Sequence, residues 1–159
     1  NTKRPDQSWH SMIENLQIYH VNVNCNDFER SLAFYKMIGF KEHMDFGEGG
    51  VDGLGFERCR LKARLLSLGD DPRATVLDLI EWTEPPTEGT PYPSLANAGI
   101  ARICFRLKNL EGAYAELVEK GVEFLSEPIE ENLGGHKQKF VCFKDPDGTI
   151  LEFVEFIKD

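Results

Sequence analysis

The fold is decided by residues 18–40, IYHVNVNCNDFERSLAFYKMIGF. The beginning of this stretch is rich in Ile, Tyr and Val, which predicts a strand over residues 16–23. Asn26 is followed three positions later by Glu29, as in a capping box, and apolar residues then recur at helical spacing. Gly39 lies where a helix C-terminal cap belongs. The stretch therefore predicts a strand followed by a helix.

The same order of elements recurs in the second half of the chain, where residues 100–107 are strand-like, Asn109 can cap a helix and Gly121 takes the place of Gly39. Three further strand-like segments follow each predicted helix. They cover residues 40–46, 54–68 and 75–82 in the first half, and residues 122–125, 139–143 and 149–157 in the second. The last strands align as well, LDLIE at 77–81 against LEFVE at 151–155. The chain thus contains a duplicated βαβββ module.

The duplication sets the expected organisation of the chain. Residues 1–15 form a polar leader that we expect to be flexible, residues 16–83 form the first module and residues 100–157 form the second. Residues 84–99 contain four prolines, which cannot continue a sheet, and are expected to be the linker. The Gly-rich residues 47–55 are expected to form a loop. One α+β structural domain results.

Composition excludes several classes of partner. With 27 acidic and 18 basic residues the net charge is −9, so nucleic acid is not an expected partner. No apolar run approaches the roughly 18 residues that a membrane span needs, and no membrane partner is expected. The four cysteines form no C-x-x-C pair and three lie in strand-like runs, which predicts free thiols and a cytoplasmic location.

Three segments carry a resemblance to a known superfamily: IYHV at 18–21, DFERSLAFY at 27–35 and DPDGTILE at 145–152. With the duplicated module, they resemble the vicinal oxygen chelate superfamily, which includes glyoxalase I, methylmalonyl-CoA epimerase, extradiol dioxygenases and fosfomycin or bleomycin resistance proteins. The resemblance spans residues 16–157. It implies two tandem βαβββ modules whose curved sheets surround a cup-shaped site, with the helices outside.

Metal-dependent members of this superfamily take one ligand from the first and one from the last strand of each module. The resemblance carries this role to His20, Asp78, Arg102 and Glu152. The repeat selects the same four positions, because it aligns His20 with Arg102 and Asp78 with Glu152. His20, Asp78 and Glu152 have side chains that can ligate a divalent cation. Arg102 cannot, because its guanidinium has only donors and keeps its proton.

Three arrangements remain open at these positions. Arg102 supplies the positive charge by pairing with Asp78 and Glu152 in a metal-free site; or it points away and leaves a metal site of His20, Asp78 and Glu152; or His136 joins as a further ligand. A guanidinium near a divalent ion would be repelled by several kcal/mol, which favours the first arrangement. One divalent metal ion or none are both retained as predictions.

Residues 58–65 alternate strictly between charged and apolar side chains. The architecture implied by the resemblance puts the apolar side under the helix and the charged side in the cup. On that hypothesis Arg60 or Arg58, together with Arg102, binds an acidic substrate, and Asn22 lines the same site. The alternative is a charged face exposed to solvent.

The resemblance implies a small-molecule enzyme of the glyoxalase, epimerase, isomerase or lyase type. Glu152 or Asp78 would remove a proton next to a carbonyl, and a metal or Arg102 would stabilise the oxyanion. The rival hypothesis is a non-catalytic, metal-free binding or resistance protein of the same fold. Aromatic residues facing the cup with no compensated acid among them would favour the binder. A buried but solvent-reachable Glu152–Arg102 or Glu152–metal centre would favour the enzyme. Exposed strand edges make a homodimer a further prediction.

Overall fold

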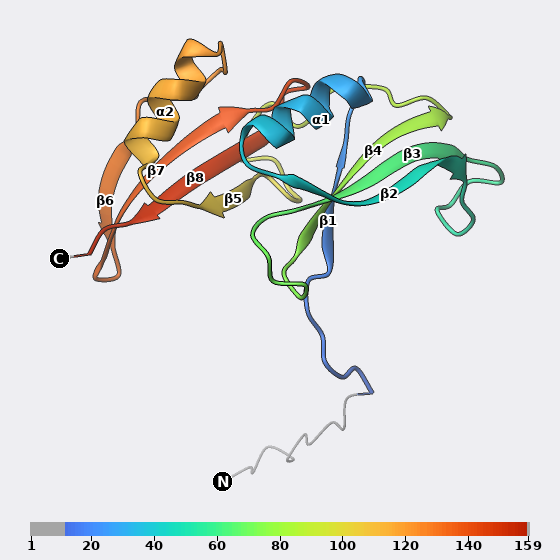
Figure 1. Ribbon diagram of the computed structural model, residues 1–159, viewed down its shortest axis with the longest axis horizontal. Coiled ribbons are helices and arrows are strands. Elements are labelled where there is room, and N and C mark those ends of the chain that lie inside the picture. Colours follow the sequence, from blue (N-terminus) through green and yellow to red (C-terminus); the bar gives the residue numbers. More distant parts are fainter. Residues whose placement is uncertain (1–11, 159) are drawn as a thin grey trace, which may run out of the picture.

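The computed structural model describes residues 12–158, so most of the expected leader lies outside the described residues. The chain forms two four-stranded sheets that lie side by side (Figure 1). The first sheet has the order β1 (His20–Asn24), β4 (Val76–Glu84), β3 (Arg60–Ser67), β2 (Lys41–Gly50), and the second has the order β5 (Ile103–Arg106), β8 (Ile150–Phe156), β7 (His136–Lys144), β6 (Ile129–Leu133). Helix α1 (Phe28–Met37) follows β1, and α2 (Leu110–Glu119) follows β5. The predicted α+β fold of two tandem βαβββ modules is confirmed.

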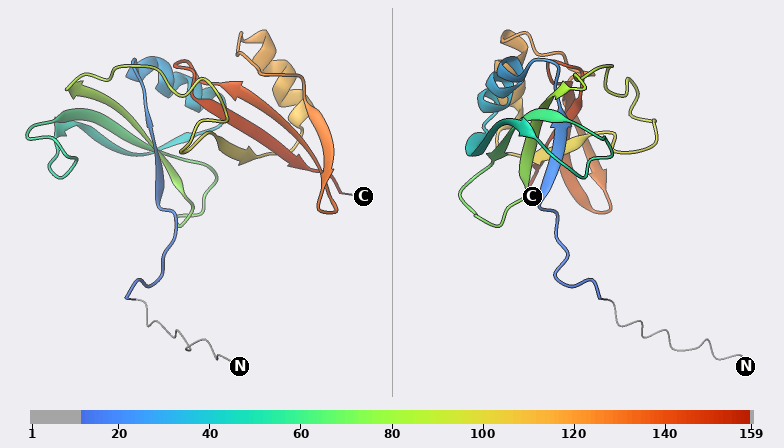
Figure 2. Two further views of the ribbon diagram at one scale, coloured as in Figure 1. Left: turned by 180° about the vertical axis from the view of Figure 1, so that it is seen from behind. Right: turned by 90° about the vertical axis from the view of Figure 1, so that its right-hand side faces the viewer.

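The two sheets share one topology. In each, the first strand of the module pairs in parallel with the last, and the remaining pairs are antiparallel. Both helices lie on the same side of the sheets, which leaves the opposite faces open (Figures 1 and 2). Each helix has 10 residues, and no helix among the described residues is long and apolar enough to cross a membrane.

Each helix begins at a side-chain cap. The N-cap of α1 is Asp27, whose carboxylate accepts a hydrogen bond from the Arg30 backbone N–H at 3.1 Å. This cap comes directly after the predicted one, Asn26, because the Asn26 side chain is bonded instead to Asp147. The Asn109 side chain caps α2 as predicted, by accepting from the Gly112 N–H at 3.1 Å.

One apolar core runs through both modules. The Phe34 ring of α1 lies 6.5 Å from Phe143 of the second module, and Phe40 lies 5.4 Å from Phe105, measured between ring centroids. Complete burial of an aromatic or aliphatic side chain stabilises a fold by about 1.5–3 kcal/mol. The fully buried members of this core come from both modules and include Tyr35, Leu79, Leu110, Phe143 and Leu151.

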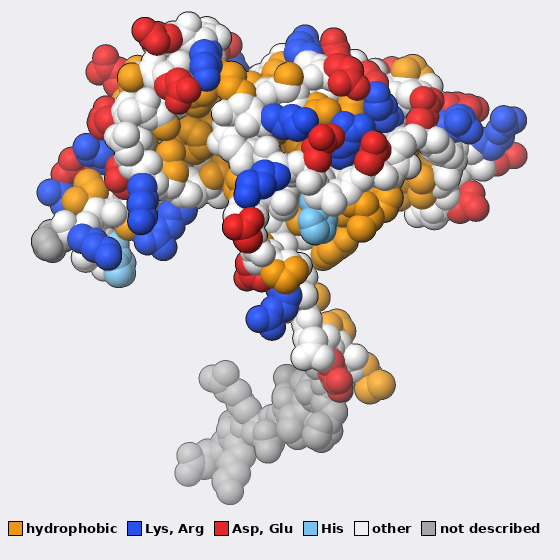
Figure 3. Space-filling view, in the orientation of Figure 1, with side chains coloured by type: hydrophobic (Ala, Val, Ile, Leu, Met, Phe, Trp, Pro, Cys, Tyr) orange, Lys and Arg blue, Asp and Glu red, His pale blue; other side chains and the backbone are white. Residues whose placement is uncertain are grey.

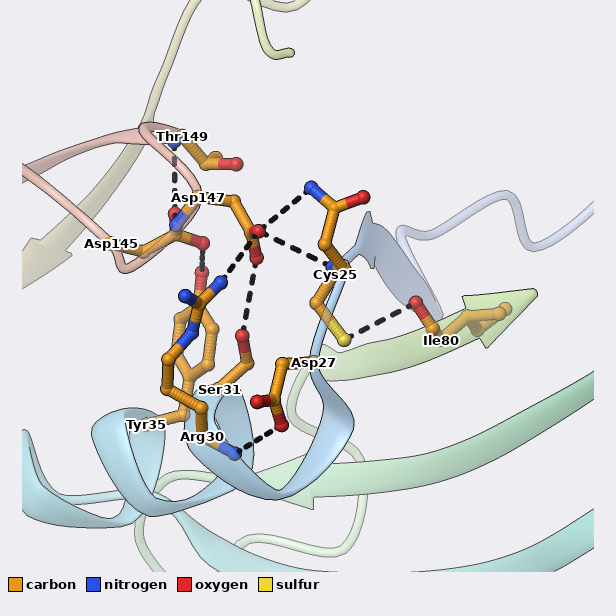
Figure 4. A network of polar contacts seen from close by, with 10 residues as sticks. Cys25, Asp27, Arg30, Ser31, Tyr35, Ile80, Asp145, Asp147 and Thr149 are labelled. Carbon is orange, nitrogen blue, oxygen red and sulfur yellow. Dashed lines mark hydrogen bonds and ion pairs between the residues drawn. The ribbon is translucent and has the colours of Figure 1, made fainter. Parts of the chain in front are cut away.

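The turn between β7 and β8 fastens the second module to α1 (Figure 4). The Asp147 carboxylate, 3% exposed, accepts from the Arg30 guanidinium at 2.9 Å, the Asn26 side-chain amide at 2.9 Å and the Ser31 hydroxyl at 3.3 Å. The Tyr35 hydroxyl donates to Asp145 at 2.7 Å. A carboxylate at a helix N-terminus is favoured by the helix dipole. The turn therefore holds the modules together as well as starting β8.

Three predictions about the strands were wrong. Residues 54–59 of the expected strand 54–68 are irregular, and β3 begins only at Arg60. Residues 122–125 are not a strand and contribute only an isolated bridge from Phe124 to Phe143, because Phe124 packs into the core between Tyr114 and Phe143. The second strand of this module is β6, further along the chain. Conversely, β2 continues to Gly50 through residues expected to be a loop. Gly47, with φ of 63°, lies at a register shift that lets the strand bend and continue.

Candidate functional site

The four positions selected by the repeat form two equivalent pairs on the sheet faces opposite the helices. In the first module, His20 Nε2 of β1 lies 3.8 Å from Asp78 Oδ2 of β4. In the second, Arg102 Nε, just before β5, donates to Glu152 Oε1 of β8 at 2.8 Å. Each pair joins the beginning of a module to its last strand, so the structure places the repeat-related positions in equivalent contacts.

Asp78 is the most unusual carboxylate of the first pair. Its side chain is only 12% exposed, and Oδ1 has no hydrogen-bond partner among the described residues. Burial raises the pKa of Asp78, while the nearby His20 opposes the shift. Asn22 binds only the backbone of this residue, by donating from Nδ2 to the Asp78 carbonyl oxygen at 3.1 Å. A desolvated carboxylate with a raised pKa is a stronger proton acceptor than an ordinary aspartate.

The Asp78 carboxylate lies at a cavity of about 500 Å³ on the open face of the first sheet. Besides His20, Asn22 and Asp78, the lining is mainly apolar and includes Phe46, Leu54, Leu61, Ala63, Ile80 and Trp82. Trp82 is fixed by a 3.2 Å hydrogen bond from its indole N–H to the Asn24 side-chain oxygen. The cavity therefore places one titratable pair at an apolar surface.

The hypothesis that the charged side of β3 faces the cup was wrong. Leu61 and Ala63 line the cavity, whereas Lys62 and Arg64 lie on the helix side. Both cations lie over the Phe28 ring, at 4.5 and 5.2 Å from its centroid. They remain there because α1 and β2 supply carboxylates, 3.0 Å from Lys62 and 2.6 and 3.0 Å from Arg64. The long side chains cover the edge of α1 while their charges stay paired.

The two arginines predicted to bind an acidic substrate do not line this cavity. Arg58 is 81% exposed, with Nε 4.0 Å from Glu84 Oε1, and Arg60 is exposed at the start of β3. Of the three arginines in that hypothesis, Arg102 is the one that pairs with a carboxylate at the repeat positions, that of Glu152. The cavity is therefore lined without Arg58 and Arg60.

Two cysteines flank Glu152, and no sequence pattern had pointed to them as site residues. Cys104 of β5 and Cys142 of β7 are its register partners, and the Cys142 Sγ lies 3.7 Å from Glu152 Oε1. Burial, with a contribution from Glu152, raises the pKa of Cys104 to about 12, so this thiol stays protonated at neutral pH. All four cysteines are free, as predicted. Strand register, which sequence alone did not supply, is the signal that finds these two.

One member of the donor set at the four positions, Arg102, cannot ligate a divalent metal. Among residues 12–158, no three His, Cys, Asp or Glu side chains form a group that could hold an ion. Arg102, which cannot ligate, occupies an oxygen of Glu152. His136 does not complete the set, because it begins β7 whereas Cys142, the register partner of Glu152, lies near the other end of that strand, about 20 Å away at the rise of a strand.

A second cavity, of about 400 Å³, separates the edge of β1 from the start of β5. Its lining includes Asn22, Asn24, Asn26, Arg102 and Asp147. Asn22 also lines the first cavity, so the two cavities share this residue. β1 and β5 are each the end strand of their sheet, and each therefore has one unpaired edge.

The sequence matches the Glyoxalase/Bleomycin resistance protein/Dioxygenase superfamily over residues 17–153. The chain belongs to this family, as its motifs and duplicated fold predicted. An uncharacterized protein of Bacillus subtilis, YwkD, is 32% identical over 140 residues, which cover 87% of this chain and 95% of that protein. A lactoylglutathione lyase of Schizosaccharomyces pombe is 27% identical over 154 residues, and the match covers 87% of this chain but 47% of that protein.

Solved structures agree on the fold. A glyoxalase family protein from Bacillus cereus superposes with a TM-score of 0.74 at 16% identity, over 93% of this chain and 100% of that one. The trypanothione-dependent glyoxalase I of Leishmania major gives a TM-score of 0.61 at 18% identity, over 88% of this chain and 86% of that one. At these identities the likeness concerns the fold alone.

Proposed function

We propose that this protein is a metal-independent, glyoxalase-like isomerase or lyase that moves a proton next to the carbonyl of an anionic small molecule. The observation that carries the proposal is Asp78, a carboxylate that lines a cavity, has one fully buried oxygen without a hydrogen-bond partner among the described residues, and has a raised pKa. Leaving a carboxylate in this state costs stability, which is typical of a group retained for chemistry. The Glu152–Arg102 pair, in which the Glu152 side chain is 12% exposed and the Arg102 side chain 45% exposed, supplies a charge-compensated acid and so supports the enzyme over a passive binder.

The proposed step is a proton transfer. The Asp78 carboxylate accepts the proton of a C–H bond adjacent to the carbonyl, and the electron pair of that bond moves to the carbonyl oxygen, giving an enolate. The Arg102 guanidinium stabilises the negative oxygen. Glu152 fixes the orientation of this guanidinium by accepting the 2.8 Å hydrogen bond from Arg102 Nε. Asp78 then returns the proton to the same carbon or, where that carbon carries a hydroxyl, to the former carbonyl carbon. In the second case the hydroxyl proton moves to the enolate oxygen, and the carbon that carried the hydroxyl becomes the new carbonyl. His20, 3.8 Å from Asp78, orients the carboxylate.

We propose further that the two pairs act together in a homodimer. Within one chain the described residues do not bring His20, Asp78 and Glu152 into one group. The unpaired edges of β1 and β5 allow the first module of one copy to meet the second module of another. Each complete site would then take His20 and Asp78 from one copy and Arg102 and Glu152 from the other. A cytoplasmic location stays a prediction and agrees with the free cysteines.

The proton transfer can be tested on a thioester suggested by the lactoylglutathione lyase relative. The protein would be incubated with S-lactoylglutathione in D2O, and NMR would follow exchange of the lactoyl proton next to the carbonyl. We expect exchange that survives a chelator and is abolished in Asp78→Asn. The control is Asp70→Asn, because the Asp70 side chain is 95% exposed and pairs with Lys41 at the surface. Undetectable exchange, or exchange that Asp78→Asn leaves intact, would contradict the proposal.

Subunit mixing tests the shared site. Asp78→Asn and Arg102→Gln homodimers should each be inactive. After they are unfolded together and refolded, half of the dimers formed at random are mixed, and each mixed dimer has one intact site. Activity should then return to about a quarter of the wild-type value, by this counting. A monomer in light scattering, or no recovery in refolded samples that contain dimers, would place each site within one chain.

A further inference from the structure

Arg106 is a second guanidinium on the face of the second sheet that carries Glu152. Side chains alternate along a strand, so Cys104 and Arg106 of β5 face the same side as their register partners Glu152 and Val154 of β8. Arg102 reaches Glu152 on that same side. Figure 3 shows Lys and Arg side chains gathered along the lower part of the second module, whereas hydrophobic side chains dominate the lower part of the first.

Arg106 is held by an aromatic ring. Its Cζ lies 4.5 Å from the centroid of Phe156, at the end of β8. An arginine held over an aromatic ring has no acceptor in that ring for its N–H groups to pair with in a salt bridge, so these groups remain available to an anion. Among residues 12–158, no carboxylate lies within 4.0 Å of Arg106, unlike Arg102.

The equivalent position in the first module makes this arrangement specific to the second. The repeat alignment that relates His20 to Arg102 and Asp78 to Glu152 also relates Asn24 to Arg106 and Trp82 to Phe156. In the first module the contact is a hydrogen bond from Trp82 to Asn24. In the second it becomes a cation over an aromatic ring. The contact between first and last strand is kept, and a positive charge is added.

We propose that Arg106 is a specificity-determining residue that binds a second anionic group of the substrate, a carboxylate or a phosphate. It follows Arg102 by four positions along an extended segment, which corresponds to about 13 Å. The substrate would therefore be elongated, with the reacting carbonyl at Arg102 and an oxyanion at the other end. The roles in this proposal rest on the proposed function, because Arg102 defines where the carbonyl lies. Phe156 is a positioning residue for Arg106.

Anion binding at Arg106 can be measured without turnover. The ¹⁵N-labelled protein would be titrated with inorganic phosphate, with acetate and with neutral acetamide while the arginine Nε–H resonances are followed, with Arg106→Lys to assign the signal. We expect the Arg106 signal to shift saturably with at least one anion and not with acetamide. The signal of Arg73, an exposed arginine in the turn before β4, is the internal control. No shift at Arg106, or equal shifts at Arg73, would overturn the proposal.

The role in specificity is tested by comparing two thioesters in the exchange assay. S-lactoylglutathione carries carboxylates far from its thioester, whereas S-lactoyl-N-acetylcysteamine is neutral. Arg106→Gln should raise KM for the first by about 10- to 100-fold, the usual effect of losing a charge-assisted hydrogen bond, and leave kcat and the second thioester unchanged. Arg106→Lys should restore part of the loss, and Phe156→Leu should cause a smaller rise in KM.

An equal rise in KM for both thioesters would show a structural effect and overturn the proposal. If the wild-type protein exchanges neither thioester, the proposed function fails, and the titration with phosphate and acetate still decides whether Arg106 binds an anion.

Discussion

Tyr35→Phe should weaken the junction between the two modules, because it removes a single hydrogen bond between them. The Tyr35 side chain is fully buried, and its hydroxyl donates to Asp145 Oδ2 at 2.7 Å. Asp145 is 4% exposed, and its other oxygen keeps two backbone donors, the N–H groups of Asp147 and Thr149, both at 2.9 Å. The substitution keeps the ring packed against Phe34 and Phe40 and leaves one buried carboxylate oxygen without its donor.

The expected loss follows from the charge of the acceptor. A hydrogen bond to a charged group contributes about 1.5–3 kcal/mol, and a neutral one about 0.5–1.5 kcal/mol. We therefore expect Tyr35→Phe to lower the free energy of unfolding by about 2 kcal/mol at neutral pH. With a urea m-value of about 2 kcal/mol/M, the midpoint would fall by about 1 M.

The loss should depend on pH in a defined direction. Burial raises the pKa of Asp145 above 3.8, against the opposing hydrogen bonds from Tyr35 and the backbone. A raised folded-state pKa stabilises the fold at low pH, and this contribution is lost as pH rises through that pKa. Without the Tyr35 donor the pKa of Asp145 rises further, so the wild type and the variant should differ more at pH 7 than at pH 4.

Urea unfolding at pH 7 and pH 4, followed by fluorescence and circular dichroism, measures both effects. Tyr114→Phe is the matched control, because its ring packs edge-on against Phe124 and its hydroxyl has no hydrogen bond to a described residue. The control should change the free energy of unfolding by less than about 0.5 kcal/mol. A loss in Tyr35→Phe no larger than that of the control, or one that grows toward pH 4, would refute the argument.

Two further predictions concern the site itself. Asp78→Asn should abolish exchange yet stabilise the fold by about 1 kcal/mol at pH 7, because it removes a charge that burial disfavours. Since burial raises the pKa of Asp78, this gain in stability should vanish below about pH 3.8, where the carboxyl group is protonated in both the folded and the unfolded protein. Urea unfolding at several pH values measures the effect. Elemental mass spectrometry after addition of Zn, Ni, Mn, Co or Fe should find substoichiometric metal. The reason is that Arg102 takes the place of one of the four ligands and pairs with the carboxylate of another, Glu152. Near-stoichiometric metal that is lost in both Asp78→Ala and Glu152→Ala would contradict the metal-free proposal.

The fold could be predicted from the sequence because the duplication is written in order and spacing. The repeat aligns Gly39 with Gly121 and one acidic last strand with the other. The same alignment relates the pair His20–Asp78 to the pair Arg102–Glu152, and the structure shows both contacts. Prediction from the local pattern failed where an apolar run could mean either a buried strand or a loop packed into the core. Residues 122–125 are as apolar as a strand, but Phe124 is buried by packing against aromatic rings, and periodicity does not distinguish these two cases in so short a segment.

The chemistry of the cup was harder to predict, because it depends on which side of β3 faces the helix. Alternation separates the charged from the apolar side chains but does not say which set the helix covers. Here α1 presents an aromatic ring and a carboxylate that accommodate Lys62, so the charged set lies under the helix and the apolar set lines the cavity. Arg106 escaped prediction for a related reason. Its importance lies in its contact with Phe156, which is far away in the chain.

The divergence between the modules would let an acidic protein bind the proposed anionic substrate. With a net charge of −9 the molecule as a whole repels anions, but salt at about 0.1 M screens this repulsion beyond about 10 Å. Within that distance the local charges decide. In the first module, position 24 is a neutral Asn and the cavity is mainly apolar. In the second, Arg102 and Arg106 carry two positive charges on the face that also carries Glu152, with Glu131 further away on β6. On the proposed function, duplication has thus produced one face for the apolar part of a ligand and for proton transfer, and another for its negative oxygens.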